Sequence, residues 1–310
     1  MGGLAENEDK NMEMMNVIEG KNIVKKFKNF ELNVPELEIP AGFATALIGE
    51  NGAGKTTLLN AIAGTRLDYK GELKFFGEFS DKDRERNPEV RERIGYTGTE
   101  NYYLPGWSVD QVREISKLLF AKYDDEEFGR RYNELAISAS GRYEGGKKFS
   151  SLSDGTKTKL MLASVLARDT DLLVMDEPAS PLDPLMRDKL CELISEYISS
   201  REGRSVFFST HNISDMENIT DYAIIMEHGE IVEKGFVEDL KEKYLLVKGE
   251  PEDADAAKKV LYTFTSTKYG YEGICLAEDL DKLAGMDIST ETASLFQISV
   301  AIMKKNSRMK

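Results

Sequence analysis

The chain has 310 residues, of which 41% are hydrophobic and 31% charged, a composition typical of a folded globular protein rather than a disordered one. Its 41 Lys and Arg residues against 55 Asp and Glu residues give a formal net charge of −14, which disfavours nucleic-acid binding as a global property. Two widely spaced cysteines and the absence of any run of ~20 apolar residues argue against a disulfide framework, a zinc site and a membrane-spanning helix.

The N-terminal part of the chain is predicted to contain a tail followed by short strands. Residues 1–15 are polar and have no apolar core of a secretory signal, so we expect a flexible tail. Further on, apolar residues alternate with polar ones, as in half-buried strands, at Phe30, Leu32, Val34, Leu37 and Ile39. Pro35 and Pro40 restrict these strands to sheet edges or strand ends.

A glycine-rich turn lies between an apolar strand at residues 43–48 and a helix at residues 56–63, with Gly64 as its expected stop. The turn matches the phosphate-binding pattern G-x-x-x-x-G-K-[ST] in full. Its glycines allow successive backbone N–H groups to face one anion, and the following helix adds its positive dipole end. The sequence therefore predicts a nucleotide-binding segment made of Gly49, Glu50, Asn51, Gly52, Ala53, Gly54, Lys55, Thr56 and Thr57.

Residues 96–150 mix charged and aromatic residues, and we expect them to be largely helical, without a chemical motif. Helix and strand signals then alternate at residues 154–168, 172–175, 184–200, 205–208 and 222–232, the last with a hairpin turn at His228 and Gly229. Uniformly apolar strands separated by helices predict an α/β fold with a mainly parallel sheet covered on both faces. Residues 246–310 change rhythm and are predicted to form a small C-terminal α+β accessory domain.

Two carboxylates follow the apolar strand at residues 172–175. Asp176 stands at the end of this strand, where it can hold Mg²⁺ directly or through water. Glu177 is one residue further on, so its side chain points in another direction and can polarise an attacking water. Without the phosphate-binding turn, the pair would fit a solvated strand end equally well.

Together with these two motifs, three further segments resemble those of ABC ATPases in order and spacing across residues 16–245. They read Leu-Ser-Asp-Gly-Thr at residues 152–156, Ser-Pro-Leu-Asp at 180–183 and Ser-Thr-His at 209–211. The resemblance implies a P-loop ABC cassette with a mainly parallel core sheet, an antiparallel β subdomain and a helical subdomain near residues 96–150. The C-terminal accessory domain follows this cassette.

The resemblance implies a role for each residue of the nucleotide site. Lys55 would contact the phosphates of ATP, while Thr56 and Asp176 would hold Mg²⁺. Glu177 would act as the general base, and His211 would be the switch histidine that contacts the γ-phosphate. The alternative for His211 is a capping or core histidine.

The resemblance also implies a dimer with two composite sites. Residues 152–156 correspond to the signature segment that touches the γ-phosphate bound by a partner subunit, through Ser153 and Gly155. Residues 180–183 resemble the loop that communicates across the dimer. Phe27 is the best match for the aromatic that stacks on adenine, and its alternative is a core aromatic at a strand end.

The sequence departs from the family pattern at Asp154, Thr156 and Thr99. Asp154 places a negative charge near a phosphate, which a helix N-terminus or a cation such as Lys157 or Lys159 can compensate. Thr99 stands where the family has a Gln that senses Mg²⁺ and couples to the permease, and Glu100 is a candidate substitute. These departures bear on the rate of hydrolysis.

The chain also resembles a branch of bacterial ATPases that serve small type-two export permeases, near the acetoin-utilisation-type group, in residues 205–211 and in its short appendage. The resemblance implies a cytoplasmic ATPase subunit, peripheral on the inner face of the cell membrane, that forms a homodimer or heterodimer and drives a separately encoded permease. Two alternatives remain: a soluble ABC ATPase of translation or DNA repair, and a P-loop small-molecule kinase. A single cassette without long coiled coils disfavours the soluble ABC ATPase of translation or DNA repair. If the chain were a kinase, the match of His211 and residues 153–155 to the ABC pattern would be accidental.

Overall fold

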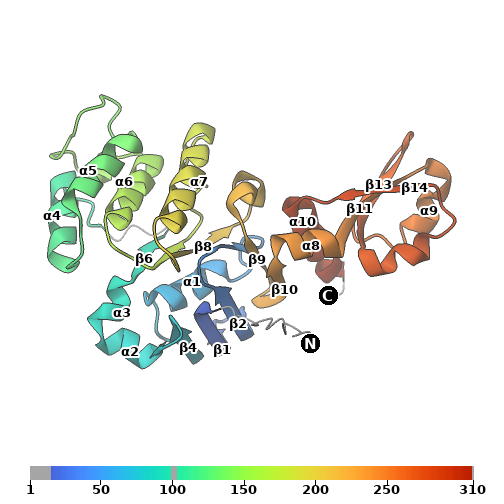
Figure 1. Ribbon diagram of the computed structural model, residues 1–310, viewed down its shortest axis with the longest axis horizontal. Helices are drawn as coiled ribbons and strands as arrows, with labels where there is room; N and C mark the ends of the chain where they lie inside the picture. The colour runs from blue at the N-terminus through green and yellow to red at the C-terminus, as the bar shows by residue number, and fades with distance from the viewer. Residues whose placement is uncertain (1–14, 99–102, 309–310) are drawn as a thin grey trace, which may run out of the picture.

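The computed structural model describes residues 15–98 and 103–308 (Figure 1). Its central sheet has six strands in the order β10-β9-β3-β8-β7-β6. All neighbouring strands pair in parallel except β9 and β10, which form the predicted hairpin. The prediction of a mainly parallel core sheet is therefore confirmed. The strands are β3 (Ala44–Ile48), β6 (Ile94–Thr97), β7 (Leu172–Met175), β8 (Ser205–Thr210), β9 (Tyr222–Glu227) and β10 (Glu230–Phe236).

Alternating side chains of the central strands bury both faces of this sheet. Leu172 and Val174 of β7 pack in one core with α1 (Lys55–Ala63) and with a second, antiparallel sheet. That sheet has the order β2-β1-β4-β5, with strands β1 (Asn16–Lys26), β2 (Glu31–Pro40), β4 (Lys70–Phe75) and β5 (Phe79–Ser80). Pro35 lies within β2, an edge strand, as its missing N–H requires.

The opposite face of the central sheet is covered by helices (Figure 1). Of these, α6 (Asp154–Leu166) and α7 (Pro184–Ser199) lie against the strands, and α4 (Val109–Leu119) and α5 (Asp125–Glu134) pack beside α6. Two short helices, α2 (Asp81–Arg86) and α3 (Pro88–Glu92), precede β6. The expectation that residues 96–150 are largely helical holds only in part. Among the described residues of that stretch, only α4, α5 and a 3₁₀ turn at Phe149–Ser151 are helical, and residues 135–148 are irregular. Gly141, Gly145 and Gly146 fall there, and glycine disfavours helix formation.

The C-terminal residues form a third sheet, antiparallel throughout, in the order β12-β13-β11-β14. One of its faces has its own small core beneath α9 (Ala254–Ala257) and a 3₁₀ helix, Ala277–Leu283. Its other face shares the main core with α8 (Val237–Lys243) and α10 (Leu295–Arg308), which lie between this sheet and the cassette in Figure 1. The strands are β11 (Tyr244–Gly249), β12 (Thr265–Thr267), β13 (Gly270–Leu276) and β14 (Ile288–Thr292).

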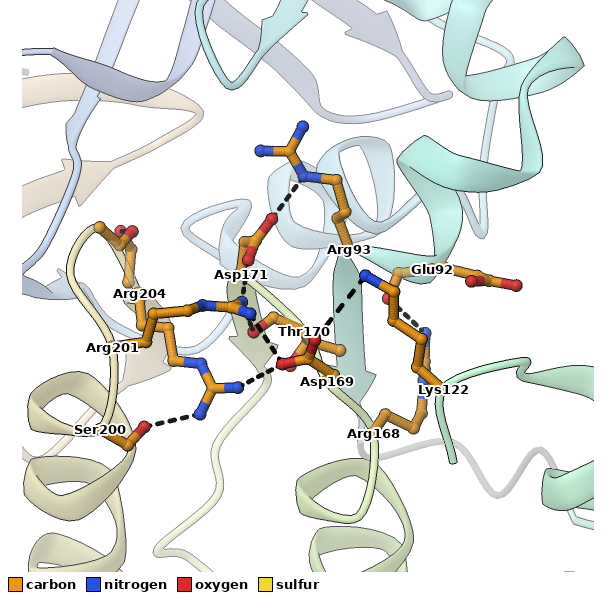
Figure 2. A network of polar contacts seen from close by, with 12 residues as sticks. Glu92, Arg93, Lys122, Arg168, Asp169, Thr170, Asp171, Ser200, Arg201 and Arg204 are labelled. Carbon is orange, nitrogen blue, oxygen red and sulfur yellow. Dashed lines mark hydrogen bonds and ion pairs between the residues drawn. The ribbon is translucent and has the colours of Figure 1, made fainter. Parts of the chain in front are cut away.

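Charged side chains tie the amino end of β7 to its neighbours (Figure 2). Asp169 accepts hydrogen bonds from Arg201 at 2.8 Å and from Arg204 at 2.6 Å. Asp171 pairs with Arg93 and also with Arg201. The network joins the end of α6 to β6 and to the chain that follows α7, at the edge of the sheet opposite the phosphate-binding turn.

Within residues 15–98 and 103–308, no helix combines the length and the apolar composition needed to cross a membrane.

Candidate functional site

Three of the predicted segments lie together at the carboxyl edge of the central sheet. Residues 49–57 follow β3, Asp176 and Glu177 follow β7, and His211 follows β8. Because β3, β8 and β7 are adjacent and parallel, their carboxyl ends meet at one edge, which is where open α/β sheets bind ligands.

The phosphate-binding turn has the backbone geometry that its glycines permit. Gly52 and Gly54 have φ values of 87° and 107°, a region that residues with a Cβ atom rarely adopt. Gly54 is also the N-cap of α1 and offers no side-chain cap, so it leaves the first N–H groups of that helix for a ligand to bind. The helix begins at Lys55, one residue earlier than expected, and ends at Gly64 in the left-handed conformation, as predicted.

Lys55 is buried within this turn, with only 6% of its surface exposed. Its ammonium group donates to the carbonyl oxygens of Gly49 at 2.7 Å and Glu50 at 3.2 Å. The same nitrogen lies 3.4 Å from Oε1 of Glu177. The turn therefore holds the lysine by its own backbone, and a carboxylate balances the buried positive charge.

Thr56 and Asp176 meet directly, although they are 120 positions apart in the sequence. The Thr56 hydroxyl donates to Oδ2 of Asp176 at 2.8 Å, and Oδ1 accepts from the buried Ser209 hydroxyl at 2.6 Å. Hydroxyl and carboxylate oxygens are the ligands that Mg²⁺ prefers, so the two predicted metal ligands fit that ion. Ser209 was named from the sequence only as part of the segment at residues 209–211 and was given no role, although a hydroxyl at the end of an apolar strand was a readable signal.

Glu177 is held by both its backbone and its side chain. Its N–H donates to Ser209 Oγ at 2.9 Å, and its φ of 50° is unusual for a residue with a side chain. Oε2 lies 2.7 Å from Nδ1 of His211, whereas Oε1 is buried and accepts no hydrogen bond from the described residues. The only charged partner recorded for that oxygen within the described residues is the Lys55 ammonium, so it becomes available to accept a proton when Lys55 takes another partner.

A pocket of about 680 Å³ opens beside the phosphate-binding turn. Besides residues of the turn and Glu177, it is lined by Phe27, Asn29 and Phe30. Phe27 is 41% exposed, which excludes the alternative of a core aromatic, and its ring centroid lies 5.9 Å from that of Phe30. Sequence reasoning missed Asn29 and Phe30, which lie only two and three residues after Phe27.

Ser153 and Gly155 lie at the start of α6 and do not line this pocket. Ser153 is the N-cap of α6, and its Oγ accepts the N–H of Thr156 at 3.3 Å. A Cβ atom on Gly155 would lie 2.7 Å from the carbonyl oxygen of Pro181, so this glycine permits close contact with residues 180–183. Their predicted role concerns a nucleotide bound by a partner subunit.

The exposed Asp154 pairs with Lys157, one of the two lysines expected to compensate its charge. Lys157 Nζ lies 2.9 Å from Oδ1 of Asp154, one helical turn away. The departures at Thr99 and Glu100 fall outside the described residues.

Relatives among known proteins include ATP-binding proteins for both import and export. The methionine import ATP-binding protein MetN of Campylobacter jejuni is 30% identical over 242 residues, which cover 72% of each chain. The nickel import ATP-binding protein NikO of Rhodobacter capsulatus is 29% identical over 66% of this chain and 82% of its own. The Nod factor export ATP-binding protein I of Cupriavidus pinatubonensis is 30% identical over 67% of this chain and 62% of its own. Placement in an exporter branch thus stays a prediction.

Solved structures and a family model agree with the architecture. An ATP-binding subunit of an ABC transporter superposes with a TM-score of 0.61 at 22% identity, over 73% of this chain and 92% of that one. A dimeric bacterial ABC transporter cassette gives a TM-score of 0.61 at 20% identity, over 71% of this chain and 98% of that one. Residues 32–180 match the ABC transporter family. The chain belongs to this family, as one of its ATP-binding ATPase subunits.

Proposed function

We propose that this subunit binds ATP and Mg²⁺ beside residues 49–57, hydrolyses the ATP as a dimer, and drives a separately encoded membrane permease from the inner face of the cell membrane. One observation carries the proposal: the Thr56 hydroxyl lies 2.8 Å from Asp176 while Lys55 lies 3.4 Å from Glu177. The phosphate-binding turn and the two strand-end carboxylates therefore form one site, in which phosphate, metal and water can meet.

ATP binding uses groups that the protein already holds in place. The free N–H groups at the start of α1 and the Lys55 ammonium face the phosphates, and each charge-assisted hydrogen bond contributes about 1.5–3 kcal/mol. Thr56 and Asp176 would hold Mg²⁺, which neutralises negative charge on the phosphates. Lys55 exchanges the Glu177 carboxylate for phosphate, which releases that carboxylate for its own role. Phe27 offers a partly exposed ring for stacking on the adenine.

Hydrolysis depends on the orientation of Glu177. Once phosphate has replaced Glu177 as the partner of Lys55, Oε1 accepts a proton from the attacking water, since this oxygen has no hydrogen bond to the described part of the chain. His211, 2.7 Å from Oε2, keeps the carboxylate in place and contacts the γ-phosphate. Loss of the γ-phosphate then removes contacts that hold the two subunits of the dimer closed.

Dimerisation completes each site with the N-terminus of α6 from a second subunit, the same or a related chain. Ser153 and Gly155 stand at that N-terminus, outside their own subunit's pocket, where backbone N–H groups and the helix dipole favour an anion. The solved bacterial ABC transporter cassette that is similar to this chain is dimeric. ATP-driven closing and opening of the dimer would move the permease through the helical region near residues 96–150.

Two substitutions test the assignment. Glu177→Gln should retain ATP binding, nearly abolish turnover and favour an ATP-bound dimer, because the amide cannot accept the proton but leaves the site's shape intact. Lys55→Ala should weaken ATP binding itself. Calorimetry, phosphate release and size-exclusion chromatography measure these effects, with Glu238→Gln on the exposed start of α8 as a matched control. Turnover at the parent rate in Glu177→Gln would refute the role of the general base, and unchanged affinity in Lys55→Ala would refute the phosphate site.

A further inference from the structure

The C-terminal helix α10 returns from the accessory domain and packs on the chain that follows His211 (Figure 1). We refer to residues 211–219 as the switch segment; it contains two short 3₁₀ helices, Ile213–Asp215 and Glu217–Ile219. Ile213 and Met216 are each 1% exposed and belong to the same core as the fully buried Leu295 and Ile298 of α10. The switch segment and α10 are therefore one packed unit.

A carboxylate of the switch segment also caps α10. Glu217 accepts the N–H of Leu295 at 2.8 Å and that of Phe296 at 3.4 Å, through its two oxygens, across 78 and 79 positions of sequence. Ser294 Oγ accepts the third free N–H, from Gln297, at 3.2 Å. A helix N-terminus needs acceptors for these groups and favours negative charge. Local residues thus provide only part of the cap, and the cassette provides the charged part.

On its other side the switch segment is joined to the loop at residues 180–183. Asp215 accepts a hydrogen bond from Arg187 at 2.9 Å and from the side chain of Asn212 at 3.1 Å. Arg187 also donates from Nε to the carbonyl oxygen of Leu182 at 3.0 Å. The segment that begins with His211 is therefore held between α10 and the loop expected to communicate across the dimer.

We propose that Glu217 is a positioning residue through which α10 of the accessory domain holds the switch segment, and with it His211, in the orientation needed for hydrolysis. The inference rests on the proposed function, since it needs His211 to act at the γ-phosphate. Glu217 belongs to the switch segment and lies outside the nucleotide pocket, so it controls turnover rather than nucleotide affinity.

The physical reason lies in how His211 is attached. Its side chain is 45% exposed, and its one side-chain hydrogen bond that the structure records is to Glu177. In the proposed function Glu177 loses its contact with Lys55 when ATP binds, so it is not a fixed anchor for His211. Its placement then depends on the backbone of the switch segment, which Glu217 fixes to α10. A partner that moves the accessory domain, and α10 with it, would therefore change the rate of ATP hydrolysis at a distance.

The test compares Glu217→Ala and Glu217→Gln in the full-length chain, with Glu238→Ala on the exposed surface of α8 as the control. Glu217→Ala should lower kcat about three- to tenfold and leave the affinity for ATP within about twofold. It should also accelerate amide hydrogen exchange in both the switch segment and the first turn of α10. Glu217→Gln keeps an acceptor of the same length, so it should recover part of the rate.

A double-mutant cycle with His211→Ala separates this inference from the proposed function. If Glu217 acts through His211, Glu217→Ala should have little further effect on kcat in the His211→Ala background. An equal loss in both backgrounds, or an unchanged kcat with faster exchange confined to α10, would overturn the positioning role and leave the proposed function standing. If His211→Ala itself retained the parent kcat, the assignment of His211 would be refuted, and the inference with it.

Discussion

Ser209→Ala is the most direct test of how the site is assembled. The hydroxyl of Ser209 is fully buried at the end of β8, where it donates to Asp176 and accepts the N–H of Glu177. One oxygen atom thus joins the expected metal ligand to the backbone of the expected general base. Alanine removes this atom and changes little else in volume.

The magnitude follows from the two lost hydrogen bonds. Leaving a buried group without its partner costs about 1–3 kcal/mol, and bonds to charged groups lie in the upper part of that range. We therefore expect Ser209→Ala to lower the free energy of unfolding by about 2–4 kcal/mol. Glu177 loses the bond that supports its unusual φ of 50°, so kcat should fall by about tenfold or more.

Urea unfolding at constant m-value and phosphate release measure the two effects. Ser214→Ala, at an exposed position of the switch segment, is the matched control and should change neither quantity appreciably. A Ser209→Ala variant with the parent's unfolding midpoint and the parent's kcat would refute the reasoning, because the two hydrogen bonds would then contribute nothing.

Two further predictions concern the dimer and the response to acid. Gly155→Ala places a Cβ atom 2.7 Å from the carbonyl oxygen of Pro181, so we expect weaker ATP-driven dimerisation with unchanged nucleotide affinity; normal dimerisation in size-exclusion chromatography would contradict it. A hydrogen bond from Arg131 lowers the pKa of Glu196 from 4.5 to about 2. The ionised Glu196 therefore contributes its full stability above about pH 4.5, and this contribution is lost as the pH falls towards 2. Glu196→Gln should remove that part of the pH dependence of the free energy of unfolding. The effect should be no more than about 1 kcal/mol, because this carboxylate is 46% exposed. If the free energy of unfolding fell equally with pH in the parent and in the variant, the role of the Glu196–Arg131 pair would be refuted.

Much of the fold was readable from local signals. The glycines of the phosphate-binding turn, the helix stop at Gly64 and the first-turn position of Pro184 in α7 all lie where the sequence placed them. The hairpin at His228 and Gly229 does too, with positive φ at both residues. Each of these signals depends on a residue's own backbone preference or on partners within four positions, so no tertiary information was needed.

Other features depend on contacts that no local pattern reports. Residues 135–148 lie within the stretch 96–150 that was expected to be largely helical, yet they are irregular, and three glycines fall among them. Asn29 and Phe30 were passed over because their value comes from the pocket they share with Phe27. By contrast, the pairing of Asp154 with Lys157 rather than Lys159 was local, because Asp154 and Lys157 are three positions apart on α6.

The sequence by itself determined which residue types reach the carboxyl edge of the central sheet, because each motif directly follows its own apolar strand. Only the tertiary structure decided how those residues are paired: Thr56 with Asp176, Lys55 with Glu177, and Glu217 with the start of α10. These pairs join segments that are 78 to 122 residues apart. Such partners are chosen by the order of strands in the sheet and by helix packing, and both follow from the burial of the whole chain's apolar surface rather than from any short stretch of it.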